Sequence, residues 1–153
     1  MKKFLVTLSI VLCTVAVATA QPRAIGARLG GDIDFSYQHS LGDNMLDLSA
    51  GLGLGKGFMS FGVAGAYDWI FPLSGWQYDG DWNFYVGPGL GLHIMTESPV
   101  FALSIGGQVG IEYAFEIPLN LSLDYRPMIN LLGFGSKTWG HFYGLALGVR
   151  YRF

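Results

Sequence analysis

The sequence predicts an all-β protein, an eight-stranded antiparallel up-and-down transmembrane β-barrel. Three observations support this fold class. Apolar residues recur at every second position in segments of about ten residues, as in strands with one apolar face. The chain holds 23 glycines and only 13% charged residues, whereas soluble domains carry about 25%. Beyond residue 20, no apolar run reaches the roughly 18 residues that a membrane-spanning helix needs.

Residues 1–20 have the features of a secretory signal peptide. Lys2 and Lys3 provide a positively charged start, residues 4–18 form an apolar run, and Ala18-Thr19-Ala20 is a small-residue cleavage site. We therefore expect residues 1–20 to be cleaved and residues 21–153 to form one exported domain. Because Cys13 is the single cysteine, the mature chain would contain no disulfide bond.

The charge and the ligand-type residues of the mature chain exclude several function classes. Removing Lys2 and Lys3 from the 9 basic residues leaves 7, against 11 acidic ones. This mild acidity gives no reason to expect a nucleic-acid partner. No paired His or Cys residues stand at the spacing of a metal site. We expect neither a metal nor another cofactor.

Four segments alternate in the first half, over residues 24–29, 32–38, 46–55 and 59–69. Their apolar faces are Ile25, Ala27 and Leu29; Ile33, Phe35 and Tyr37; Leu46, Leu48, Ala50, Leu52 and Leu54; and Met59, Phe61, Val63, Gly65, Tyr67 and Trp69. Glycine and polar or charged residues fill the other face. Each segment is therefore predicted to be one strand.

Four longer segments follow, over residues 82–94, 101–115, 119–130 and 144–153. Their apolar rows run from Trp82 to Ile94, from Phe101 to Phe115, from Leu119 to Ile129 and from Leu145 to Phe153. No Asp, Glu, Lys or Arg interrupts the apolar row of any of the eight segments. Since lipid cannot satisfy backbone polar groups, strands with such a face must close on one another.

Parity decides the number of strands. Bacterial barrels of this kind have an even number, and eight requires that residues 23–38 form two strands. A three-residue loop, Gly30-Gly31-Asp32, provides the break and leaves Leu29 opposite Ile33. This loop and those at about residues 55–58, 95–100 and 132–139 are expected to lie together at the outer end of the barrel.

Aromatic residues gather at the predicted strand ends nearest the C-terminus. We expect them to form a belt at the headgroup level. The members are Tyr37, Trp69, Trp82, Phe84, Tyr113, Phe115, Tyr151 and Phe153. A thinner belt is expected at the opposite end, from Met59, Phe61, Phe101, Tyr125 and Tyr143.

The chain resembles the small eight-stranded outer-membrane β-barrel domain proteins of the OmpA/OmpX-like class. The similarity covers residues 23–153, in "AIGARLGG", "SYQHSLG", "YVGPGLGL", "GIEYAFEIPLNLSLDYRP" and "ALGVRYRF". It implies localisation in the outer membrane of a Gram-negative bacterium, reached through the signal peptide. It also implies that Tyr151 and Phe153 are an assembly signal on the last strand. The implied partners are outer-membrane lipid, the outer-membrane assembly machinery and periplasmic chaperones.

Charged residues on the inward face are expected to form a polar network. The interior of an eight-stranded barrel is just wide enough for side chains to fill it, and buried charges must be paired. The predicted members are Arg28, Asp34, Glu112, Asp124, Arg126 and Arg150. Glu112 and Asp124 are the acids expected to neutralise Arg126 and Arg150.

The function predicted from these residues is a structural or surface-interaction role of a monomeric barrel, without catalysis. A lipid A-modifying hydrolase or acyltransferase is an alternative, since some small outer-membrane barrels modify lipid A with His, Ser and a carboxylate near the outer rim. Here His93 points inward near that rim, with Glu97 and Ser98 in the adjoining loop and His141 on the lipid side. Their spacing carries no triad motif.

A narrow, porin-like pore for small solutes is a third hypothesis. The inward glycines Gly87, Gly89 and Gly91 thin the lining of the wall and could leave a wet path. Eight strands, however, leave no open channel by geometry.

Overall fold

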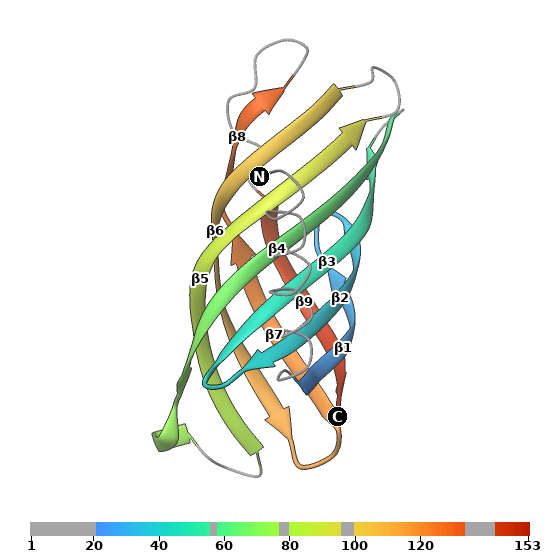
Figure 1. Cartoon of the computed structure of the whole chain (residues 1–153). Helices are drawn as coiled ribbons and strands as arrows, with labels where there is room; N and C mark the ends of the chain where they lie inside the picture. Colours follow the sequence, from blue (N-terminus) through green and yellow to red (C-terminus); the bar gives the residue numbers. More distant parts are fainter. Residues whose placement is uncertain (1–20, 56–57, 77–79, 96–99, 134–142) are drawn as a thin grey trace, which may run out of the picture.

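The computed structural model describes residues 21–55, 58–76, 80–95, 100–133 and 143–153 (Figure 1). The described chain is built from strands and one 3₁₀ turn, η1. In chain order these are β1 (Gln21–Leu29), β2 (Ile33–Leu41), β3 (Asn44–Gly55), β4 (Phe58–Pro72), η1 (Ser74–Trp76), β5 (Gly80–Met95), β6 (Val100–Phe115), β7 (Leu119–Arg126), β8 (Met128–Gly133) and β9 (Tyr143–Arg152).

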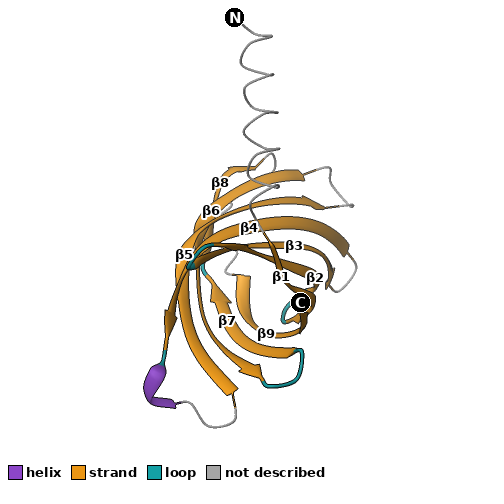
Figure 2. Cartoon of the chain, turned by 60° about the horizontal axis from the view of Figure 1, so that its bottom comes forward, coloured by secondary structure: helices purple, strands orange, loops and turns teal. Residues whose placement is uncertain are grey.

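The strands close into an eight-stranded antiparallel barrel, as predicted. Each of β1 to β5 pairs with the next strand along the chain, β6 pairs with β7, and β9 pairs with both β7 and β1. The pairing of Ile25 with Tyr151 and of Leu29 with Leu147 closes the cylinder. Figure 2 shows the strands curving around a common axis. Closure leaves no open sheet edge along this seam.

The segment predicted as one strand over residues 119–130 is divided at Pro127. Across this break β7 and β8 keep the same register against β6, since Val109 opposes Tyr125 and Gly106 opposes Met128. Proline has no N–H to donate, so the ladder is interrupted while the chain direction continues. Because of this break, β8 is a separate strand, in addition to the eight strands that close the barrel.

Two tight turns set the register of the first three strands. The break predicted at Gly30-Gly31-Asp32 is confirmed: Leu29 pairs with Ile33, and the Gly30 N–H donates to the Asp32 carbonyl at 3.0 Å. At the other end, Gly42 has a φ of 66° in the turn between Leu41 and Asn44. Glycine adopts this left-handed conformation without steric cost. The two turns define an upper end (residues 30–32) and a lower end, which also carries Phe153.

The hairpin of β4 and β5 is longer than predicted. The alternation predicted strand ends at Trp69 and Trp82, but β4 continues to Pro72 and β5 begins at Gly80. The added pairs include Phe71 with Phe84 and Pro72 with Asn83. Apolar residues at both Ile70 and Phe71 break the period-two pattern, which is why the alternation predicts an end of β4 at Trp69. The sequence also allows the connection after Pro72 to extend the Trp82 strand in part, and β5 does begin before Trp82.

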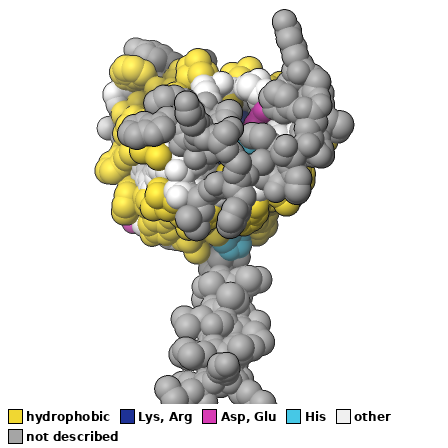
Figure 3. All heavy atoms as spheres, turned by 90° about the horizontal axis from the view of Figure 1, so that it is seen from above, with side chains coloured by type: hydrophobic (Ala, Val, Ile, Leu, Met, Phe, Trp, Pro, Cys, Tyr) yellow, Lys and Arg dark blue, Asp and Glu magenta, His cyan; other side chains and the backbone are white. Residues whose placement is uncertain are grey.

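The two faces of the wall differ sharply in chemistry. Buried inward positions include the side chains of Arg126, Arg150, Asp47, Asp124 and Glu112, whereas large apolar side chains point outward along every strand. Seen from above, hydrophobic side chains surround the barrel where the described residues are visible (Figure 3). The distribution is the inverse of that of a water-soluble domain.

Gly106 permits a close approach between β6 and the Pro127 break. A Cβ atom at Gly106 would lie 2.0 Å from the Pro127 carbonyl oxygen, a backbone atom that cannot move without shifting the chain between β7 and β8. We expect Gly106→Ala to lower the free energy of unfolding in urea by about 1–3 kcal/mol, as overpacking does. Gly144→Ala is the control, because no atom of the described residues lies within 4 Å of its Cβ position. Equal unfolding midpoints for the two variants would contradict the described packing.

Candidate functional site

The candidate site is the polar network inside the barrel, which we call the interior network. Its inward positions come from β1, β2, β3, β6, β7 and β9, so strands from both sides of the barrel contribute. The principal members are Arg23, Arg28, Asp34, Asp47, Glu112, Asp124, Arg126 and Arg150. Ion pairs link distant parts of the chain across the interior.

Asp47, on β3, is the acid at the centre of the network. Its carboxylate lies 3.0 Å from Nη2 of Arg126 and 3.4 Å from Nη2 of Arg150, and it is fully buried. Gln38 and Gln108 also donate hydrogen bonds to it, at 3.2 and 3.3 Å. One carboxylate is therefore paired with arginines from two strands across the interior, β7 and β9.

Neutral side chains satisfy further donors of the two central arginines. Arg126 donates to Gln108 at 2.5 Å and to Ser49 at 2.6 Å. Arg150 donates to Ser36 at 2.8 Å and to Ser122 at 2.6 Å. Hydrogen bonds of this kind are needed because a buried charge is costly unless it is paired and hydrogen-bonded.

The structure corrects the predicted partner of Glu112. Glu112 does not pair with Arg126 or Arg150: its ion pair is with Arg23, and Asn83 and Asn120 donate to it at 3.0 and 2.9 Å. The register of β1 against β2 shifts between Pro22 and Ala24. A bulge of this kind re-aims a side chain, so Arg23 reaches the interior although alternation assigns it to the outward row.

Asp124 and Asp34 form the upper part of the network with Arg28. The Arg28 guanidinium donates to Asp124 at 2.6 Å and to Asp34 at 3.1 Å. Asp124 also lies 3.9 Å from Arg150. The structure therefore brings all six predicted network residues to the interior, but Asp47 and Arg23, which were not among them, connect them.

Asp68 is the buried acid that the network does not neutralise. Within the described residues, neither of its carboxylate oxygens has a hydrogen-bond partner, and the side chain is fully buried. The β4–β5 ladder is interrupted here, with pairs on either side at Ala66–Gly89 and Trp69–Val86. Pro88, which cannot donate, stands in this gap.

We expect Asp68→Asn to raise the free energy of unfolding by about 1 kcal/mol. The amide has nearly the same shape, and it removes a buried charge that lacks a hydrogen-bond partner among the described residues. Urea titration of the two proteins measures the difference. A loss of stability in Asp68→Asn would show that the carboxylate is paired in solution.

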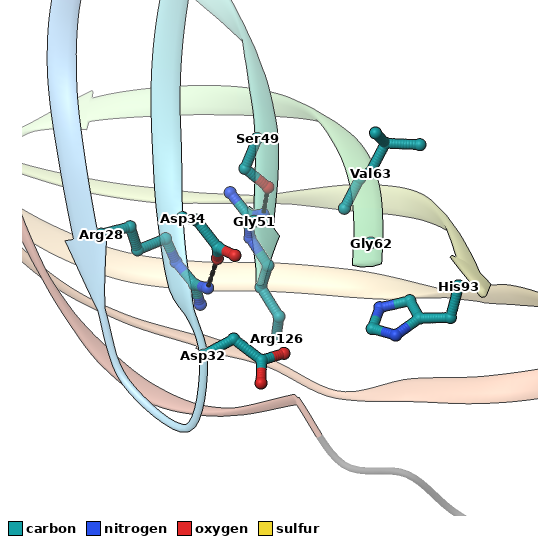
Figure 4. A pocket seen from close by; sticks show the side chains of 10 residues that line it. Arg28, Asp32, Asp34, Ser49, Gly51, Gly62, Val63, His93 and Arg126 are labelled. Atoms are coloured by element: carbon teal, nitrogen blue, oxygen red, sulfur yellow. Dashed lines mark hydrogen bonds and ion pairs between the residues drawn. The ribbon is translucent and has the colours of Figure 1, made fainter. Parts of the chain in front are cut away.

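A small pocket lies above the network, and Figure 4 shows it from close by. Gly51 and Gly62 are cross-strand neighbours in one row, flanked by Asp34 and His93. A Cβ at Gly62 would lie 2.6 Å from Nε2 of His93, so the ring lies across that glycine. The enclosed space is about 10 Å³, enough for about one water molecule.

Of the residues named for the lipid A-modifying alternative, the structure describes one, His93, and it lies at this pocket. His93 lines it, together with Arg28, Asp32, Asp34, Ser49 and Arg126. Glu97, Ser98 and His141, the other residues of that hypothesis, lie outside the described residues. Among the residues that the structure describes, no three His, Cys, Asp or Glu side chains lie close enough together to hold a metal ion.

A wider polar cavity of about 210 Å³ opens at the lower end, lined by Arg23, Ser40, Asp81, Asn83, Arg152 and Phe153, among others. Arg152 donates to the Phe115 carbonyl at 3.3 Å. Tyr151 and Phe153, the predicted assembly signal, point outward and their rings meet edge to face at 5.5 Å. No protein-family model, curated protein or solved structure matches this chain.

Proposed function

We propose that this protein is an integral barrel of a bacterial outer membrane, exported through residues 1–20, with a structural or surface-interaction role. The observation that carries the proposal is the outward apolar face of the closed barrel. Leu90, Ile105 and Ile129 lie side by side in one row and are all well exposed. Monomeric soluble proteins rarely expose apolar patches larger than a few hundred Å².

The aromatic belt predicted at the strand ends nearest the C-terminus lies at the lower end of the barrel, and we call it, together with Tyr67 and Phe71, the lower belt. It supports a membrane boundary at that end. Ring contacts join Tyr67 with Trp69, Phe71 with Phe84, and Tyr113 with both Trp82 and Phe115. Aromatic rings prefer the headgroup level of membranes. We assign this end to the periplasm, where the assembly machinery would read Tyr151 and Phe153. Among the described residues, no helix is long and apolar enough to cross a membrane.

The filled interior supports a structural role over a pore. Asp47, Arg126 and Arg150 are buried at the centre and bridge opposite walls. A solute would have to break several buried ion pairs to pass, and each broken pair is costly. The proposal therefore does not include conduction.

Refolding from urea tests the proposal. On dilution into phospholipid vesicles, we expect strand circular dichroism and slower electrophoretic migration after heating, because the unheated barrel stays compact. Dilution into lipid-free buffer should give aggregated, unfolded protein. In planar bilayers the inserted protein should carry no discrete current. Folding in lipid-free buffer would refute the membrane assignment, and discrete conductance would refute the filled interior.

A further inference from the structure

The tip of the β4–β5 hairpin is a projection at the lower end of the barrel. Trp69 is the last β4 residue paired with β3, and β4 continues to Pro72 along β5 alone. Leu73 donates to the Trp82 carbonyl at 2.8 Å, and Trp76 donates to the Leu73 carbonyl at 3.0 Å. In Figures 1 and 2 the turn η1 lies at the periphery, away from the barrel axis.

The composition of this tip does not suit water. Residues 69–76, "WIFPLSGW", contain no ionisable side chain. Phe71 is 50% exposed and Trp76 is 58% exposed. Pro72, Ser74 and Gly75 are ordinary turn residues, so the unusual feature of the tip is its exposed aromatic rings.

Ring contacts make the tip continuous with the lower belt. The Trp76 ring meets the Trp82 ring edge to face at 5.9 Å, and Trp82 lies 4.9 Å from Tyr113. Tyr113 in turn lies 4.6 Å from Phe115. The row of rings thus runs without a gap from β6 across β5 onto η1.

We propose that residues 70–76 lie in the headgroup layer of the periplasmic leaflet and that Trp76 anchors them to phospholipid. The inference rests on the proposed function, because it extends the membrane-facing surface beyond the strand ends. An indole has a large apolar body and one N–H donor, so it is most stable where hydrocarbon meets water. The backbone hydrogen bonds of the turn restrict its backbone and the contact with Trp82 restricts the Trp76 ring, which limits the entropy lost on contact with lipid.

Depth-dependent quenching of single tryptophans tests the anchor. One variant keeps Trp76 (Trp69→Phe, Trp82→Phe, Trp139→Phe) and a matched variant keeps Trp82. Both are refolded into vesicles whose lipids carry bromine either near the headgroup or near the chain ends. We expect the Trp76 emission to be quenched more strongly by the shallow bromine than by the deep one. Acrylamide in the water should quench it less than it quenches free tryptophan.

The outcomes separate this inference from the proposed function. Quenching of Trp82 by bromolipid without quenching of Trp76 would overturn the anchor, because the tip would then lie in water. Absence of bromolipid quenching at both positions would overturn the membrane assignment itself. If the triple variants fail to fold, the emission lost on Trp76→Phe alone, measured with each bromolipid, gives the same comparison.

Discussion

Asp47→Asn is expected to lower the free energy of unfolding by about 3–5 kcal/mol, the usual cost of removing one partner from a buried ion pair. Asp47 is the only carboxylate that is paired with both Arg126 and Arg150 among the described residues. The isosteric amide preserves the volume but leaves a guanidinium charge buried without its acid. Urea titration of the refolded protein measures the loss. Asp81→Asn is the control, because Asp81 is exposed at the lower end.

A double-mutant cycle isolates the contact from the general damage of the substitution. If the pair is as described, Asp47→Asn and Arg126→Gln together should cost less than the sum of the two single changes. Strict additivity would mean that the two side chains do not interact. An Asp47→Asn protein as stable as the Asp81→Asn protein would remove Asp47 from the centre of the network.

Leu90→Arg is expected to cost about 2–4 kcal/mol, the penalty for an arginine on the lipid face near the bilayer midplane. Leu90 lies on the outward row of β5, between the lower belt and the upper end. Its matched control is Ile117→Arg, in the turn between β6 and β7. The Leu90 and Ile117 side chains are 58% and 61% exposed. If both lay in water, the two substitutions would therefore change the free energy of unfolding by similar amounts.

The comparison between the two arginine variants is made in lipid vesicles by urea titration. The membrane assignment requires that Leu90→Arg lowers the free energy of unfolding while Ile117→Arg changes it little. The reason is that the cost of an arginine on the lipid face falls toward zero near the membrane interface. Similar stability of the two variants would place Leu90 in water.

The fold was predictable because one pattern dominates the chain. With the apolar row confined to alternate positions, as in Phe35 and Tyr37, only one face of each strand can be outward. The turn at Gly30-Gly31-Asp32 followed from parity and was confirmed by the pairing of Leu29 with Ile33. The break at Pro127 was not predicted, because the alternation of apolar and polar residues continues through this proline.

The sequence predicted which residues belong to the interior network better than it predicted which of them pair with one another. Alternation shows which side chains point inward, so Arg28, Asp34 and Arg150 could be assigned to the interior. It does not show how far each strand is shifted along its neighbours, and that shift decides that Arg150 reaches Asp47. The bulge that re-aims Arg23 toward Glu112 has no distinct signal in the sequence.

The outward face of β5 offers the most direct test of the central claim, that hydrocarbon is the solvent of this surface. Residues 21–153 contain no cysteine, so single cysteines at each position from Tyr85 to His93 can carry a nitroxide without interference once Cys13 is absent. In lipid vesicles, collision with oxygen should exceed collision with a water-soluble nickel complex at Val86, Leu90 and Leu92. Greater access of the nickel complex than of oxygen at those three positions would contradict the account.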